Sequence, residues 1–179
     1  DLKGLTMTKI VARSAVTALA ALLVLAVAGC APSADGSPAP AISTPVASEV
    51  VTVEDAWVKT AEEGMTAGFG VFTNSGDQDI TVVAVTTDAA SMSELHETVE
   101  DESGAMVMRP VDGGFVLPAR SDFVLEPAGN HLMMMDLAAP LAAGGEIRFT
   151  LEFSDRSTLD FTAVVKDYAG ANENYVGDE

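Results

Sequence analysis

The chain has 179 residues, of which 48% are hydrophobic, and its 27 acidic and nine basic side chains give a formal net charge of −18. This balance argues against nucleic acids and anionic lipid headgroups as partners, because contacts with phosphate require Lys and Arg. Eight methionines, two histidines and one cysteine make the chain rich in thioether and poor in thiol.

Residues 1–29 are predicted to be a secretory signal peptide, with Met7 as the true start. Lys9 and Arg13 form a short positive region, and an apolar run over residues 15–27 follows them. That run is too short for a membrane-spanning helix, which needs about 20 apolar residues, and is typical of a signal peptide.

The signal-like segment ends at Cys30 in a pattern similar to a bacterial lipobox. We therefore expect Cys30 to become the first mature residue and to carry the lipid. A second interpretation remains open, because Ala26-Val27-Ala28 also fits the site of an ordinary signal peptidase. Cleavage there would leave Cys30 as a free thiol.

Three further segments follow the signal peptide. Residues 30–48 combine Cys30 with a linker rich in Pro, Ala and Ser, which predicts an unfolded, semi-extended spacer. Residues 49–166 are long enough for one domain with a single core. Residues 167–179 are polar and acidic, so we expect a disordered tail.

The domain is predicted to be all-β, a sandwich or small barrel. Short runs rich in Val, Thr, Ile and Phe recur between turn residues, without intervening helices. Within Glu146–Phe153 the apolar residues alternate, which places Ile147, Phe149, Leu151 and Phe153 on one face. The clearest predicted strands are Val50–Val58, Ala67–Thr73, Ile80–Thr86, Phe115–Leu117, Phe123–Leu125, Glu146–Phe153 and Thr158–Val165.

Several large side chains outside the histidine region are assigned to the core. Trp57, Phe69 and Phe72 lie on predicted strands and are expected to be buried there. Met65 and Met92 are interpreted in the same way, since a lone Met on a strand usually fills space in a core.

Both histidines fall within a methionine-rich stretch. Residues 92–135 hold six of the eight methionines together with His96 and His131. Imidazole and thioether suit monovalent copper, a soft cation. Thioether does not form disulfides, so such a site stays open in an oxidising compartment.

Strand alternation sorts these methionines into two faces. On a strand, His131, Met133 and Met135 would point to one face, while Leu132 and Met134 would point to the other, buried face. His131 and Met133 could then share a metal. Met106 and Met108 would also share a face, with Val107 on the other side.

The stretch His96…Met108-Arg109-Pro110-Val111…His131-Leu132-Met133 resembles the motif of the periplasmic copper chaperones called PCuAC. The family pattern has ten residues between His and Met and twenty-one between Met and His-x-Met, where this chain has eleven and twenty-two. Asp136 stands where the family usually has Gly. The resemblance also covers Val53–Val58, Phe72–Asn74 and Pro140-Leu141.

The resemblance implies a cupredoxin-like fold and a function as an extracytoplasmic copper(I) chaperone for cytochrome c oxidase assembly. A Sco-type chaperone or an oxidase subunit would accept the copper. With the lipobox, it implies a protein anchored to the outer face of the membrane of a bacterium, and the lipoprotein form favours a Gram-positive one. The implied ligands are His96, Met108, His131 and Met133, with Met106 and Met135 as substitutes.

Two other functions compete with the copper carrier. A redox copper protein would need a Cys thiolate, and Cys30 is in the signal-like segment. No pattern marks an acid, a base or an open coordination position beside a substrate cleft, so we expect no enzyme. A β-sandwich scaffold or adhesion lipoprotein without metal would not be stabilised by copper.

Overall fold

The computed structural model describes residues 45–171 and 174–175. Met7, the predicted signal peptide, Cys30 and residues 31–44 of the predicted spacer therefore lie outside the described residues. No helix within the described ranges is long and apolar enough to span a membrane. The described elements are α1 (Ala47–Val50), β1 (Val51–Lys59), β2 (Thr66–Asn74), β3 (Ile80–Thr86), β4 (Ala90–Glu100), β5 (Met106–Pro110), β6 (Phe115–Leu117), β7 (Ser121–Leu125), β8 (His131–Leu137), β9 (Glu146–Phe153), β10 (Thr158–Lys166) and β11 (Asn174–Tyr175).

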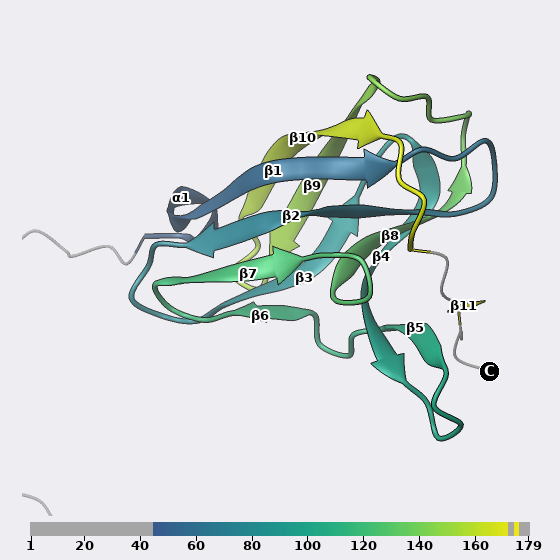
Figure 1. Cartoon of the computed structure of the whole chain (residues 1–179). Coiled ribbons are helices and arrows are strands. Elements are labelled where there is room, and N and C mark those ends of the chain that lie inside the picture. The colour runs from purple at the N-terminus through teal and green to yellow at the C-terminus, as the bar shows by residue number, and fades with distance from the viewer. Residues whose placement is uncertain (1–44, 172–173, 176–179) are drawn as a thin grey trace, which may run out of the picture. The chain divides into compact units, whose positions relative to one another are not determined.

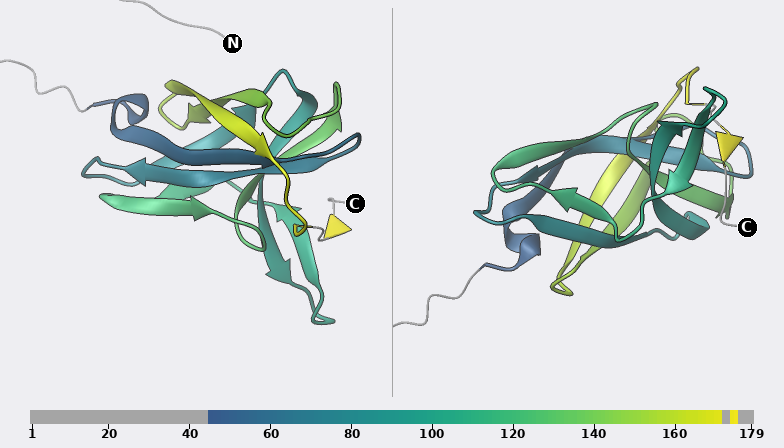
Figure 2. Two further views of the ribbon diagram at one scale, coloured as in Figure 1. Left: turned by 45° about the horizontal axis from the view of Figure 1, so that its top comes forward. Right: turned by 90° about the horizontal axis from the view of Figure 1, so that it is seen from below.

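The strands form a curled, sandwich-like sheet (Figure 1), which confirms the predicted all-β class. Neighbouring strands follow the order β11-β5-β4-β8-β2-β1-β10-β9-β3-β6, and β7 pairs with β2 outside this path. The β1–β10 and β5–β11 pairs are parallel. The hairpin of β4 and β5 extends from one end of the sandwich (Figure 2).

The core forms where the inward faces of the strands meet. Phe149, Leu151 and Phe153 of β9 are fully buried, and Ile147 packs against them from a partly buried position, so the predicted face is confirmed. Met134 of β8 joins the same cluster. Burying one such side chain contributes about 1.5–3 kcal/mol.

The three aromatic residues assigned to the core have different surroundings. Phe72 is in the main core, whereas Phe69 is buried outside that cluster. Trp57 is only half-buried, so its assignment to the core is wrong. Its ring lies 4.6 Å from that of Phe69 and 5.3 Å from that of Tyr168, measured between centroids, at the rim of the sandwich.

The domain begins before residue 49, the start predicted from the sequence. Ala47 is buried, and its N–H donates a 2.7 Å hydrogen bond to the carboxylate of Asp155. This bond, with a second from the Ser157 hydroxyl, holds the pKa of Asp155 below its usual value. The last two residues of the predicted spacer, Ala47 and Ser48, are therefore the start of α1.

Part of the predicted disordered tail is ordered against the domain. The Lys59 ammonium donates hydrogen bonds of 2.6 and 3.1 Å to the carbonyls of Gly170 and Ala171. Beyond them β11 pairs in parallel with Val107 and Met108 of β5. Composition did not predict these contacts, because they are made by backbone groups.

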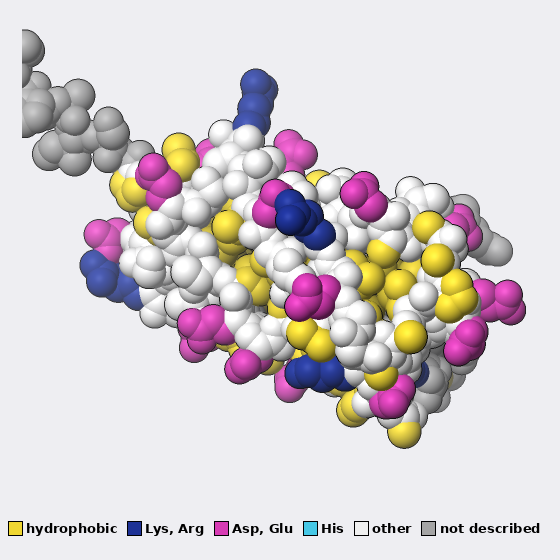
Figure 3. Space-filling view, turned by 90° about the horizontal axis from the view of Figure 1, so that it is seen from above, with side chains coloured by type: hydrophobic (Ala, Val, Ile, Leu, Met, Phe, Trp, Pro, Cys, Tyr) yellow, Lys and Arg dark blue, Asp and Glu magenta, His cyan; other side chains and the backbone are white. Residues whose placement is uncertain are grey.

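Acidic side chains are spread over the face of the domain that Figure 3 shows, rather than gathered in one cluster. Figure 3 shows Asp and Glu at many separate points of one face, with a smaller number of Lys and Arg. This arrangement fits the high net negative charge of the chain.

Candidate metal centre

The sheet brings the two histidines of the chain side by side. His96 of β4 lies directly opposite His131 of β8 in the antiparallel register. Their ring centroids are 5.6 Å apart, and the side chains are 0% and 2% exposed. Directly opposed residues share a face, so two residues 35 positions apart in sequence become one imidazole pair.

Two buried methionines lie on the same face of the sheet as this pair. Met133 follows His131 by two residues on β8, so it points to the same face. Met108 of β5 lies opposite Thr98, which follows His96 by two residues on β4. Met108 and Met133 are 7% and 1% exposed and form, with Met135, a buried cluster separate from the main core.

The main core lies on the other face of β8. Leu132 and Met134 belong to the cluster that contains Phe149. The predicted alternation along β8 is therefore confirmed, with His131 and Met133 on the opposite side from Met134.

Hydrogen bonds orient both imidazole rings. His131 Nδ1 lies 3.0 Å from the carbonyl oxygen of Gly129, and His96 Nε2 lies 2.8 Å from a carboxylate oxygen of Glu94. Both oxygens accept, so these ring nitrogens are the donors. In the neutral rings the lone pairs then lie on His131 Nε2 and His96 Nδ1, the nitrogens that could donate to a metal.

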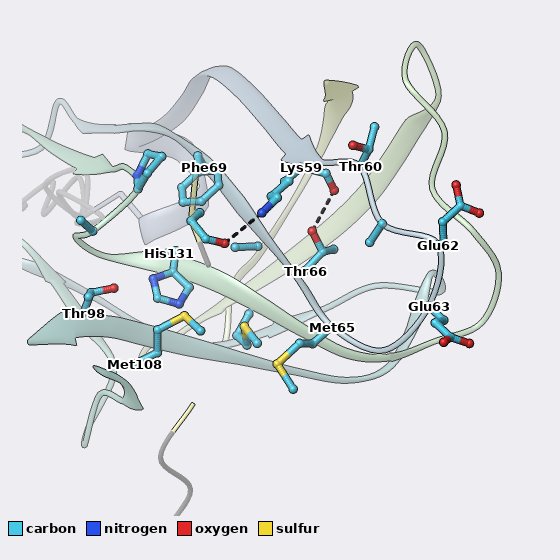
Figure 4. Close-up of a pocket in the computed structure, with 16 residues that line it drawn as sticks. Lys59, Thr60, Glu62, Glu63, Met65, Thr66, Phe69, Thr98, Met108 and His131 are labelled. Atoms are coloured by element: carbon cyan, nitrogen blue, oxygen red, sulfur yellow. Dashed lines mark hydrogen bonds between the residues drawn. The ribbon is translucent and has the colours of Figure 1, made fainter. Parts of the chain in front are cut away.

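A cavity of about 390 Å³ opens beside His131. Figure 4 shows the Met108 thioether next to the His131 ring, with Met65 farther along the cavity towards Glu62 and Glu63. Phe69, Met133 and Ala171 also line it. The cavity therefore leads from the surface to His131, Met108 and Met133.

The donor atoms gathered here are soft. Within residues 45–171 and 174–175, no three His, Cys, Asp or Glu side chains come together as metal ligands. Imidazole and thioether are the donors that His96, His131, Met108 and Met133 offer. Such a set suits a soft monovalent cation better than a hard divalent one.

A family profile described as "Putative lipoprotein LpqE-like" matches residues 51–165. The chain belongs to the LpqE-like family. It is 46% identical over 171 residues to "Putative lipoprotein Lxx21020" of Leifsonia xyli subsp. xyli, covering 96% of this chain and 100% of that protein.

Solved structures similar to this LpqE-like chain include PCuAC domains. The apo PCuAC domain from PmoF1 superposes with a TM-score of 0.56 at 19% identity, covering 66% of this chain and 94% of the other. Copper(I)-loaded DR1885 from Deinococcus radiodurans gives a TM-score of 0.50 at 27% identity, covering 69% and 85%. The predicted PCuAC resemblance and cupredoxin-like fold are confirmed.

The substitute ligands lie in different surroundings. Met135 is 9% exposed within the methionine cluster, whereas Met106 is 42% exposed and lies opposite Glu100, away from the histidine pair. This geometry favours Met108 over Met106 as the partner of the two histidines. The extra residue of the first gap can be absorbed in the turn over residues 101–105.

Two methionines assigned to the core are not in it. Met65 and Met92 are 49% and 48% exposed, so that prediction is wrong. Met92 lies opposite Met135 on the outer face of the sheet, and Met65 precedes β2 at the cavity mouth. Met92, Glu94 and His96 are spaced two residues apart on β4, so strand alternation predicts that they share a face. The general preference of Met for cores predicts burial instead, and it does not hold at Met92.

Sequence reasoning also missed Glu94, whose i, i+2 spacing to His96 was the available signal.

The substitution at Asp136 has a backbone explanation. Asp136 has φ of 54°, a left-handed conformation that Gly adopts without strain and that Asp tolerates better than most residues. The family's usual Gly at this position therefore fits the left-handed backbone near the C-terminal end of β8.

Proposed function

We propose that this protein is a copper(I) carrier rather than an enzyme, and that His96, Met108, His131 and Met133 bind its cargo. The observation that carries the proposal is the buried cross-strand histidine pair with the Met108 and Met133 cluster on the same face of the sheet. Support also comes from DR1885, which is copper(I)-loaded in its solved structure and 27% identical to this chain.

The test is anaerobic titration of the full chain with Cu(I), in competition with zinc. Soft donors should make Cu(I) binding much the stronger. Trp57, the single tryptophan, is a local reporter, since its ring contacts Phe69, whose centroid lies 6.3 Å from that of His131. Equal or stronger zinc binding would contradict the proposal, as would unchanged copper affinity in His131→Ala.

We further propose that Cys30 is lipidated and holds the domain outside the cytoplasm, at the outer face of a bacterial membrane, by the linker before α1. Support comes from the lipobox-like pattern and from the description of both the family and its Leifsonia relative as lipoproteins. Two acyl chains give stable anchoring, where one gives marginal binding. Cys30→Ser should release the protein to the medium or leave uncleaved precursor; a mature N-terminus at Gly29 with an unmodified thiol would contradict lipidation.

The proposed destination of the copper is cytochrome c oxidase assembly, directly or through a Sco-type chaperone. A carrier must release its cargo, and a cavity beside His131 gives an acceptor protein access to the ligands. Mixing the copper-loaded protein with an apo acceptor domain should move Cu(I) without added chelator. Retention of all copper by the loaded protein would argue for storage instead.

A further inference from the structure

Three methionines outside the proposed ligand set form a row across the outer face of the sheet. Met92 of β4 lies directly opposite Met135 of β8. On the other side of β8, Met65 lies between the Thr66–Met134 pair and the hydrogen bond from the Leu137 N–H to the Gly64 carbonyl. Continuing the β2–β8 register by one residue beyond β2 therefore places Met65 next to Met135.

The row is open to solvent. Met65 and Met92 are 49% and 48% exposed, and Met135, between them, is 9% exposed. Scattered exposed apolar residues are normal on a protein surface. Met92 and Met135 are a different case, because they are a directly opposed cross-strand pair, whose Cβ atoms stand about 4.5–5.5 Å apart. Met65 extends this pair, since it comes one residue before the Thr66–Met134 pair.

The row is continuous with the proposed copper site. Met135 belongs to the buried cluster of Met108 and Met133. Met65 lines the cavity together with those same two methionines. Glu62 and Glu63, both exposed, stand on the same cavity wall and add negative charge that attracts cations to this end.

We propose that Met65, Met92 and Met135 form a second copper(I) site, a capture site at the surface that loads the buried histidine pair. Three neutral thioethers suit Cu(I), which accepts soft ligands. Transfer inward is ligand exchange, in which one thioether of the row is replaced by one of the buried set. Copper stays monovalent throughout, so no electron is gained or lost. The inference rests on the proposed copper function.

The test uses the full chain with ¹³C-methyl methionine, titrated anaerobically with Cu(I). We expect two ions per chain, the second weaker, with the Met65 and Met92 methyl signals shifting during weak binding. The double variant Met65→Leu/Met92→Leu should bind one ion and load it more slowly. Met106→Leu is the matched control, since Met106 is also exposed on a strand but lies outside the row.

The outcomes separate this inference from the function on which it rests. A wild-type chain that binds no copper overturns the proposed function and the capture site together. A single ion that depends on His131, with loading unchanged in the double variant, overturns the capture site alone. The double variant could instead lose acceptor binding while its copper stoichiometry and loading rate stay unchanged. That result would make the row a contact surface for a protein and would also overturn the capture site. His131→Ala should lose the tight ion and keep the weak one.

Discussion

Methionines on the two faces of β8 have different surroundings. On the inner face, Met134 is fully buried with Leu132 against the aromatic core. On the outer face, Met133 is almost as well buried, but its neighbours are Met108 and Met135, on the side of the sheet that carries His131. Burial alone therefore does not separate a packing methionine from a candidate ligand, whereas the side of the strand does.

The largest expected effect comes from truncation on the inner face. Met134→Ala should lower the free energy of unfolding by about 2–5 kcal/mol, because it leaves a cavity beside the core side chains. Copper binding per folded molecule should not change. Chemical denaturation measures the first quantity and titration of the folded fraction the second. Loss of copper binding with normal stability would show that the two faces are reversed.

A smaller effect is expected from a residue that supports the outer face. Glu94→Gln replaces the carboxylate that accepts the 2.8 Å bond from His96 Nε2 with an amide of the same shape. Such a change beside a metal ligand typically weakens binding by about 10–100-fold. Copper affinity measured by competition should fall while the melting temperature of the apo protein stays near that of the wild type. An unchanged affinity would mean that Glu94 does not orient a ligand.

Acid should also act on the outer face. Imidazole binds a metal only in its neutral form, so protons compete with copper at His96 and His131. Thioethers do not titrate in this range. Copper affinity should therefore decrease from pH 7.5 to pH 5, as measured by competition at each pH. If the copper affinity did not change with pH, the methionines alone would account for it and the histidines would not be ligands.

The smallest effect is expected at an outer position away from the histidines. Met106→Leu should change the free energy of unfolding by less than about 0.5 kcal/mol, since the side chain is 42% exposed. Copper affinity should be unchanged as well, because Met106 lies opposite Glu100 rather than near His96. A loss of affinity in this variant would move the candidate ligand from Met108 to Met106.

Much of the fold and part of the site could be predicted from the sequence. The alternation in β9 is a local pattern, and so is the placement of His131 and Met133 on one face of β8 with Met134 on the other. Side chains alternate between faces along a strand, so these assignments follow from the sequence alone. Cross-strand pairing is not local. Nothing within β4 or β8 alone places His96 opposite His131, and only the motif resemblance associates the two histidines.

The errors have the same cause. The general preference of methionine for cores does not apply to Met65 and Met92, whose surroundings depend on strands far away in sequence. The polar composition of the tail predicts disorder, but Lys59 holds the tail through backbone carbonyls, which composition does not reveal. In both cases tertiary contacts decided the outcome.

The most direct test of the account compares Met133→Leu with Met134→Leu. The two substitutions make the same chemical change at adjacent residues, removing sulfur while nearly conserving volume, and each should cost less than about 1.5 kcal/mol of stability. Cu(I) affinity should fall by about tenfold or more in Met133→Leu, in line with losses seen when metal sites are perturbed. It should stay at the wild-type value in Met134→Leu. Equal affinities, or a loss confined to Met134→Leu, would contradict the assignment of the outer face of β8 to copper.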